Sequence, residues 1–132
     1  MSSIIVSAGH VMVTEDGFDI ECRVNAEDLP TTLTASLKAS NGTMTAPASL
    51  NWALVTLLFP AMKKGFDLHL DGSVCTRLLY DAQNDLQTLL RHYEPSLRLI
   101  KVTATKPITP QRLKGRRTAT GFSAGIDSYT TI

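Results

Sequence analysis

The chain has little that would suit a secreted, zinc-binding or membrane-spanning protein. It holds only two cysteines, Cys22 and Cys75, which form neither a CxxC pair nor a Cys/His pattern with zinc-ligand spacing. We therefore expect two reduced thiols rather than a disulfide. No apolar run approaches the roughly 18 residues of a membrane span, and residues 1–6 lack the basic segment of a secretory signal. A cytoplasmic location is the resulting expectation.

The chain also has no large excess of positive or negative charge. The formal net charge is +1 and charged residues make up 19% of the chain, so no overall field attracts nucleic acid or an anionic membrane. Aromatic residues are few, at 6%, but the hydrophobic content of 43% is too high for a disordered protein. A length of 132 residues suits one folded domain with a tail.

Alternation of apolar and polar residues predicts a small sheet. Residues 11–13 and 18–24 predict an N-terminal hairpin around Asp16-Gly17, with Gly17 at positive φ. Further strands are expected at residues 33–38, 43–45, 66–70 and 97–104.

Two segments have the apolar spacing of helices. Residues 49–64 are apolar on most sides, and Pro60 within them should kink or restart the helix before Gly65 caps its end. Residues 74–93 carry one apolar face and follow Ser73, the expected N-cap. Two main helices packed on a small sheet predict an α+β fold.

Composition divides the chain into three parts. Residues 1–105 contain the periodic segments and are expected to form one α+β accessory domain. Residues 106–117 hold prolines, a glycine and several cations with almost nothing apolar, which indicates a basic linker rather than an RNA-binding segment. Residues 118–132 predict a short strand, a turn of small residues and the start of a helix.

The third part holds the most specific chemical signal. A strand, a tight turn of small residues and a helix N-terminus form an anion site, because backbone N–H groups converge there and the helix dipole adds positive potential. Residues 123–128 read SAGIDS and resemble the SGGxDS loop of the PP-loop ATP pyrophosphatases. Ala124 is the one departure, since the family has glycine at that position. Residues 50–128 further resemble an accessory domain and loop of enzymes similar to 7-cyano-7-deazaguanine synthase.

The resemblance implies an ATP site. The hydroxyls of Ser123 and Ser128, with the backbone at Ala124 and Gly125, would hold the leaving pyrophosphate, and Asp127 would organise Mg²⁺. The substrate would be activated by adenylation with release of pyrophosphate. Since the adenine and substrate pockets need the remaining strands of the sheet, we expect this chain to be a truncated N-terminal portion that is not catalytic by itself.

One alternative lies on the same residues. Residues 121–125 also satisfy the GxSxG elbow of α/β-hydrolases, whose catalytic acid and histidine follow the serine. Here His10, His69 and His92 all precede Ser123, so the order of the residues disfavours a hydrolase.

A second alternative is a non-enzymatic interaction or scaffold domain, which could form a homo-oligomer such as a dimer. The apolar helix over residues 50–62 would then bind a partner. Asp81 and Asp85, one helical turn apart, have the spacing of an acid/base pair or of two cation ligands, although a charged outer face is the commoner reason for it.

Overall fold

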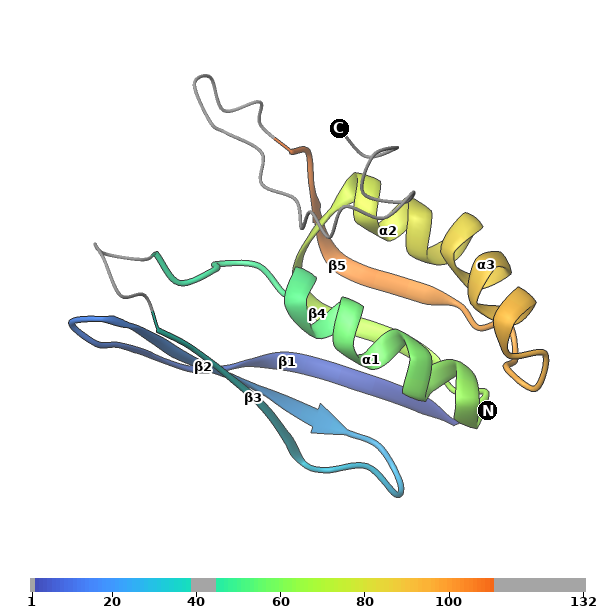
Figure 1. Ribbon diagram of the computed structural model, residues 1–132, viewed down its shortest axis with the longest axis horizontal. Coiled ribbons are helices and arrows are strands. Elements are labelled where there is room, and N and C mark those ends of the chain that lie inside the picture. The colour runs from blue at the N-terminus through green and yellow to red at the C-terminus, as the bar shows by residue number, and fades with distance from the viewer. Residues whose placement is uncertain (1, 39–44, 111–132) are drawn as a thin grey trace, which may run out of the picture.

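The computed structural model describes residues 2–38 and 45–110, which form an α+β fold of one mixed five-stranded sheet and three helices (Figure 1). The predicted fold class is thereby confirmed. The elements in chain order are β1 (Ser3–Val13), β2 (Gly17–Asn25), β3 (Thr32–Lys38), α1 (Asn51–Lys64), β4 (Asp67–Cys75), α2 (Thr76–Gln83), α3 (Asp85–Tyr93) and β5 (Val102–Ile108).

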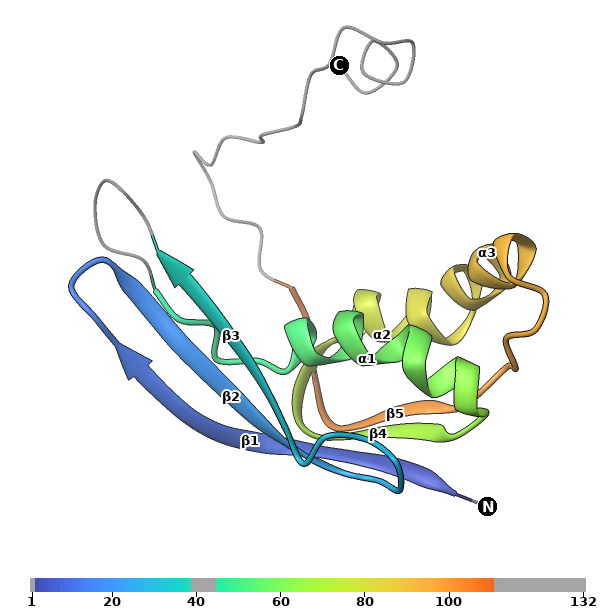
Figure 2. The same cartoon turned by 60° about the horizontal axis from the view of Figure 1, so that its bottom comes forward.

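The strands lie in the order β3-β2-β1-β4-β5. The first three form an antiparallel meander, whereas β4 pairs parallel to β1 and β5 parallel to β4. The chain reaches each of these parallel strands through a helical crossover. It passes through α1 before β4, and through α2 and α3 before β5. Because both crossovers move across the sheet in the same direction and share one hand, all three helices lie on one face (Figures 1 and 2). None of the described helices covers the other face.

The core lies between the helices and the middle of the sheet. Ile4 and Val6 of β1 sit directly beside Leu68 and Leu70 of β4, and all four are fully buried. The inward side of α1 covers them with Ala53, Leu54, Leu57, Leu58, Ala61 and Met62. Alternate residues of the strands therefore face the helices, as the period of two requires.

The N-terminal hairpin is longer than its sequence pattern predicts. β1 begins at Ser3, and only its first half lies between β2 and β4; the second half extends with β2 and β3 as an arm beyond the helices (Figure 2). Val11, Met12 and Val13 are exposed on this arm. The pairing shifts between Ala8 and Val11, where a bulge divides the two halves.

Gly17 has a different role from the one expected. Among the described residues, positive φ occurs at Asp28 and Gly65, not at Gly17. A Cβ on Gly17 would clash with the backbone carbonyl oxygen of Leu37. The glycine is therefore required by the close approach of β3 rather than by the turn.

The helix α1 follows its prediction closely. It ends at Gly65, which caps it in the left-handed conformation with φ 71°, and Lys63 and Lys64 occupy its last turn. It does not restart at Pro60 but continues through it to Lys64.

The prediction of one helix over residues 74–93 is wrong in two respects. The helix is divided into α2 and α3 at Asn84, whose φ of −120° and ψ of −96° are not helical. Its start is Thr76 rather than Val74, because β4 continues through Ser73 to Cys75. The backbone N–H of Cys75 donates to the side-chain oxygen of Asn51 at the start of α1, a long-range bond that the local pattern does not reveal.

The last strand is displaced toward the C-terminus. Leu97 and Ile100 are buried, but they precede the strand, which begins at Val102 and reaches Ile108. Pro107 therefore lies in β5 and not in the predicted linker; β5 is an edge strand, where proline is tolerated. The predicted strand at 43–45 lies mostly outside the described residues, and Thr45 itself has no regular structure.

Candidate functional site

The predicted phosphate loop lies outside the described residues. This applies to all five of its site residues, Ser123, Ala124, Gly125, Asp127 and Ser128, and to residues 111–117 of the predicted linker. The described chain leaves the sheet through β5, whose Ile108 pairs with Cys75 immediately before α2. In the sequence, the loop therefore follows the last strand of the described sheet.

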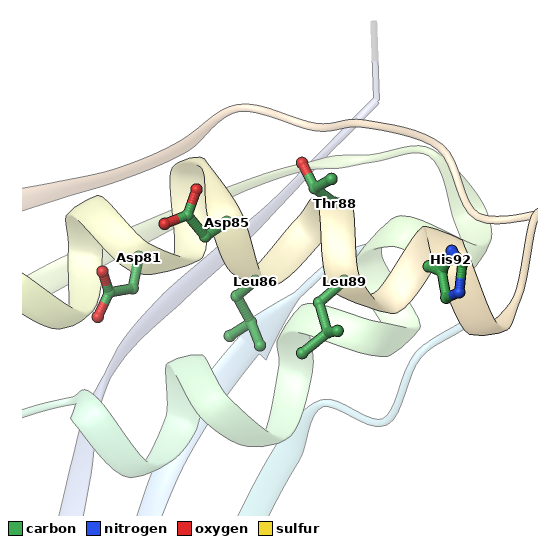
Figure 3. Close-up of a pocket in the computed structure, with 6 residues that line it drawn as sticks. All are labelled: Asp81, Asp85, Leu86, Thr88, Leu89 and His92. Carbon is green, nitrogen blue, oxygen red and sulfur yellow. The ribbon is translucent and has the colours of Figure 1, made fainter.

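A hollow with a volume of about 710 Å³ lies along α2 and α3 (Figure 3). Asp81 and Asp85 stand at one end of it and His92 at the other, with Leu86 and Leu89 between them. Its lining comes entirely from these two consecutive helices. Asp85 and His92 are exposed and Asp81 is half-buried, so the hollow is a solvated surface groove rather than an enclosed site.

The chemistry of this groove is limited. Two carboxylates one turn apart can bind a cation weakly, but a metal centre needs further ligands. In residues 2–38 and 45–110, no group of three or more His, Cys, Asp or Glu side chains is arranged to hold a metal ion. The arrangement agrees with a charged outer helix face, which was the simpler interpretation of Asp81 and Asp85.

Sequence patterns did not reveal the buried amide of Gln87, which is fully inaccessible to solvent. Its Nε2 donates to the carbonyl oxygens of Ala82 (2.8 Å) and Ile100 (3.0 Å), and its Oε1 accepts from the backbone N–H of Ile100 (2.9 Å). The buried face of α3 differs from the apolar face that the sequence spacing of residues 74–93 predicts, because Leu89 and Tyr93, which belong to that apolar face, are 53% and 78% exposed. Gln87 thus has a structural role, tying α3 to the segment before β5.

The uncovered face of the sheet is polar. His69 of β4 shares a 2.7 Å hydrogen bond through Nδ1 with the hydroxyl of Thr103 in β5. Two residues further along, the hydroxyl of Thr105 donates to Asp71 at 3.3 Å. These groups lie at the surface and pair with one another across two neighbouring strands. They explain why the face tolerates water.

The two cysteines are free thiols on different strands, as expected. Cys22 is buried in β2, and this burial raises the pKa of its thiol, although a hydrogen bond with the backbone of Leu33 acts in the opposite direction and nearby Glu21 adds to the rise. Cys75 is half-buried. A buried thiol with a raised pKa is a poor nucleophile, which argues against a catalytic role for Cys22.

Within the described part of the chain, no helix has both the length and the apolar character needed to cross a membrane. Comparisons of the whole chain with protein-family models, with curated proteins and with solved structures gave no significant match.

Proposed function

We propose that this chain belongs to an ATP-dependent PP-loop enzyme, in which the α+β domain is an accessory domain and residues 123–128 bind the pyrophosphate part of ATP. The observation that carries the proposal is the SAGIDS sequence, which matches four of the five fixed positions of the SGGxDS loop. A supporting observation is that β5, the last strand of the described sheet, ends at Ile108, before this loop begins.

The proposed reaction is adenylation. An oxygen of the substrate attacks the α-phosphorus of ATP, the bond between that phosphorus and the bridging oxygen breaks, and pyrophosphate leaves with the bonding electrons. Ser123 and Ser128 would donate hydrogen bonds to the departing pyrophosphate, and Asp127 would hold Mg²⁺ against it. The two unpaired cysteines fit a reducing compartment, so we propose a cytoplasmic location.

The test is a titration of the ¹⁵N-labelled full chain with magnesium pyrophosphate, followed by NMR. We expect amide shifts concentrated at residues 123–128, with weak binding in the millimolar range, because one loop provides only part of a nucleotide pocket. Asp127→Asn and Ser128→Ala should weaken the binding. Ser36→Ala, a matched change at an exposed residue of β3, should leave it unaltered.

Ala124→Gly sharpens the same test. Restoring the family's glycine removes a Cβ whose cost at positive φ is on the order of 1 kcal/mol, so binding should become roughly fivefold tighter. If neither the native chain nor Ala124→Gly shows shifts in the loop, the nucleotide proposal is abandoned.

A second candidate is a non-enzymatic interaction domain. It is favoured by the outward side of α1, where Val55 and Phe59, one turn apart, are 61% and 45% exposed. Two large apolar side chains at this spacing form a ridge of the kind that partner proteins cover. The pyrophosphate titration separates the candidates, because an interaction domain predicts no response in residues 123–128.

A further inference from the structure

The two edges of the sheet differ in their protection against pairing with another strand. At one edge, β5 contains Lys106 and Pro107, and both residue types prevent the addition of a further strand. At the other edge, β3 is seven residues long and pairs with β2 without a bulge. It has no proline, and its single charge is Lys38 at the end. Within residues 2–38 and 45–110, this edge has none of the usual devices that keep a strand unpaired, and no strand pairs with it; it is called the free edge.

The hydrogen-bonding groups on the free side of β3 follow from its pairing with β2. The N–H of Val24 donates to the carbonyl oxygen of Thr31 at 2.8 Å, in the same register as the rest of the ladder. Since hydrogen-bonded and non-hydrogen-bonded pairs alternate in an antiparallel ladder, residues 33, 35 and 37 direct their backbone groups to β2. Residues 32, 34, 36 and 38 therefore direct theirs to the free edge.

We infer that β3 pairs antiparallel with β3 of a second copy of this chain, about a two-fold axis at Ala35. This inference does not depend on the proposed nucleotide function. The pairing would join two sheets into one of ten strands, and its two-fold symmetry would close the assembly at a dimer.

Two features favour this register. Thr34 would form a hydrogen-bonded pair with the copy's Ser36, and Thr32 with the copy's Lys38, so every backbone group of the free edge is used. Leu33 would face the copy's Leu37 on the helix side of the sheet, and Ala35 would face its own counterpart. Leu37 is 45% exposed in the single chain, and this contact would cover it.

Neighbouring registers are less suitable. Centring the pair on Thr34 would place Lys38 opposite Pro30, which has no N–H to donate. Centring the pair on Ser36 would place Thr32 beyond the end of the copy's β3, where that strand offers it no partner. Charge is also compatible with the favoured register, because Lys38 would face Thr32 rather than another cation.

The first test measures the association of the full chain by sedimentation equilibrium over a wide range of concentration. We expect a reversible monomer–dimer equilibrium. Thr34→Pro removes an N–H that points away from β2, so the fold should persist while two intermolecular hydrogen bonds are lost. Dimer affinity should fall about tenfold or more.

A matched pair of substitutions tests the apolar contact. Leu37→Lys should weaken the dimer, whereas Leu99→Lys, the same change at a residue 61% exposed before β5, should not. NMR spectra of each variant verify that it is folded. A chain that is monomeric at all concentrations overturns the inference, as does a dimer that neither Thr34→Pro nor Leu37→Lys weakens.

Cross-linking tests the register. In a non-hydrogen-bonded antiparallel pair the two Cα atoms are about 4.5 Å apart, close enough for a disulfide. Ala35→Cys should therefore give a covalent dimer on mild oxidation, and Ser36→Cys, which would face Thr34 of the copy, should not. The native chain is the control for Cys22 and Cys75. Cross-linking of Ser36→Cys without that of Ala35→Cys would overturn the two-fold axis at Ala35.

The outcome remains separable from that of the proposed function. Thr34→Pro lies in β3 and should leave the pyrophosphate shifts at residues 123–128 unchanged. A native chain that stays monomeric but shows the pyrophosphate shifts would overturn the dimer alone. A native chain that forms the dimer but shows no shifts at residues 123–128 would overturn the nucleotide proposal alone.

Discussion

Gln87 is the single polar side chain that is buried among the residues described, and two of its three hydrogen bonds supply partners to the N–H and C=O of Ile100. These residues cross below α3 without forming a strand, yet Leu97 and Ile100 enter the core. Their backbone groups need partners there, because a buried unpaired amide is costly. The side chain of Gln87 thus supplies backbone partners where the irregular segment before β5 enters the core.

Substitution of Gln87 by leucine should lower the free energy of unfolding by about 2 to 4 kcal/mol, because it leaves the N–H and C=O of Ile100 without their side-chain partner. Urea denaturation followed by circular dichroism measures this change. Thr88→Ala, at the adjacent exposed position, should cost about 0.5 kcal/mol. Equal effects of the two substitutions would show that the amide of Gln87 is not important for stability.

Cys22 should make stability depend on alkaline pH. Its native pKa is raised by burial, so the folded protein holds this proton more firmly than the unfolded chain. The stabilisation linked to the protonated Cys22 thiol is complete below the pKa of the unfolded thiol, about 8.5. It is lost as pH rises through the pKa of the native thiol. The free energy of unfolding should therefore fall as the pH increases above that value.

Urea denaturation at about pH 7 and about pH 10 checks this expectation, with Cys22→Ala as the comparison, since the variant lacks the ionising group. The loss of stability with pH should be smaller in Cys22→Ala than in the native chain. Cys75→Ala removes the half-buried thiol and should keep the dependence that Cys22 causes. Identical pH dependence in all three proteins would contradict the assignment to Cys22.

The helix α1 is the element whose prediction succeeded best, because its signals are local. The apolar spacing, the two lysines of the last turn and the glycine after them all act within a few residues of one another. α2 and α3 show the opposite case. Asn84 donates from its side chain to the carbonyl oxygen of Tyr80 (2.8 Å), and its own backbone leaves the helical region. Such local side-chain bonding competes with helix continuation.

Pro60 in α1 offers a test of how the helix accommodates a residue without an N–H group. Replacement by alanine restores the bond to the carbonyl of Thr56, so Pro60→Ala should raise the free energy of unfolding by about 1 to 2 kcal/mol. Thermal and urea unfolding measure the gain. Val55→Ala, an exposed change in the same helix, should add no more than about 0.5 kcal/mol. A destabilised Pro60→Ala would mean that the proline is required for packing.

At the scale of the molecule, the buried apolar residues of the described part of the chain lie between Ile4 and Val102, and the last strand of the described sheet ends at Ile108. The described residues therefore contain a core of their own. A domain with its own core is expected to fold independently of the rest of the chain.

A chain ending after Pro110 should keep its fold, with a melting temperature within a few degrees of that of the full chain. A chain ending after Ile100 removes β5, whose Val102 pairs with Leu68 in the core, and should not fold cooperatively. Circular dichroism and NMR spectra of the two truncations distinguish these results. Failure of the longer truncation to fold would place residues after Pro110 within the folded unit.

Part of the architecture was predictable from local patterns, and part was not. The hairpin, α1 and the strand near residue 68 were recognised because alternation and helical spacing are properties of neighbouring residues. The first half of β1 was not, since Ile4 and Val6 are inward only through parallel pairing with β4, which lies far along the chain. The one-turn spacing of Asp81 and Asp85 was recognisable in the sequence, whereas the groove that they line and the role of Gln87 depend on tertiary structure.

Local sequence patterns suffice for the α+β class, the end of α1 at Gly65 and the SAGIDS motif, because each depends on residues close to one another in the chain. Tertiary structure decided the strand order, the burial of Gln87 and the free edge of β3. These depend on which distant segments meet, and the free energy of such contacts is not contained in any local pattern.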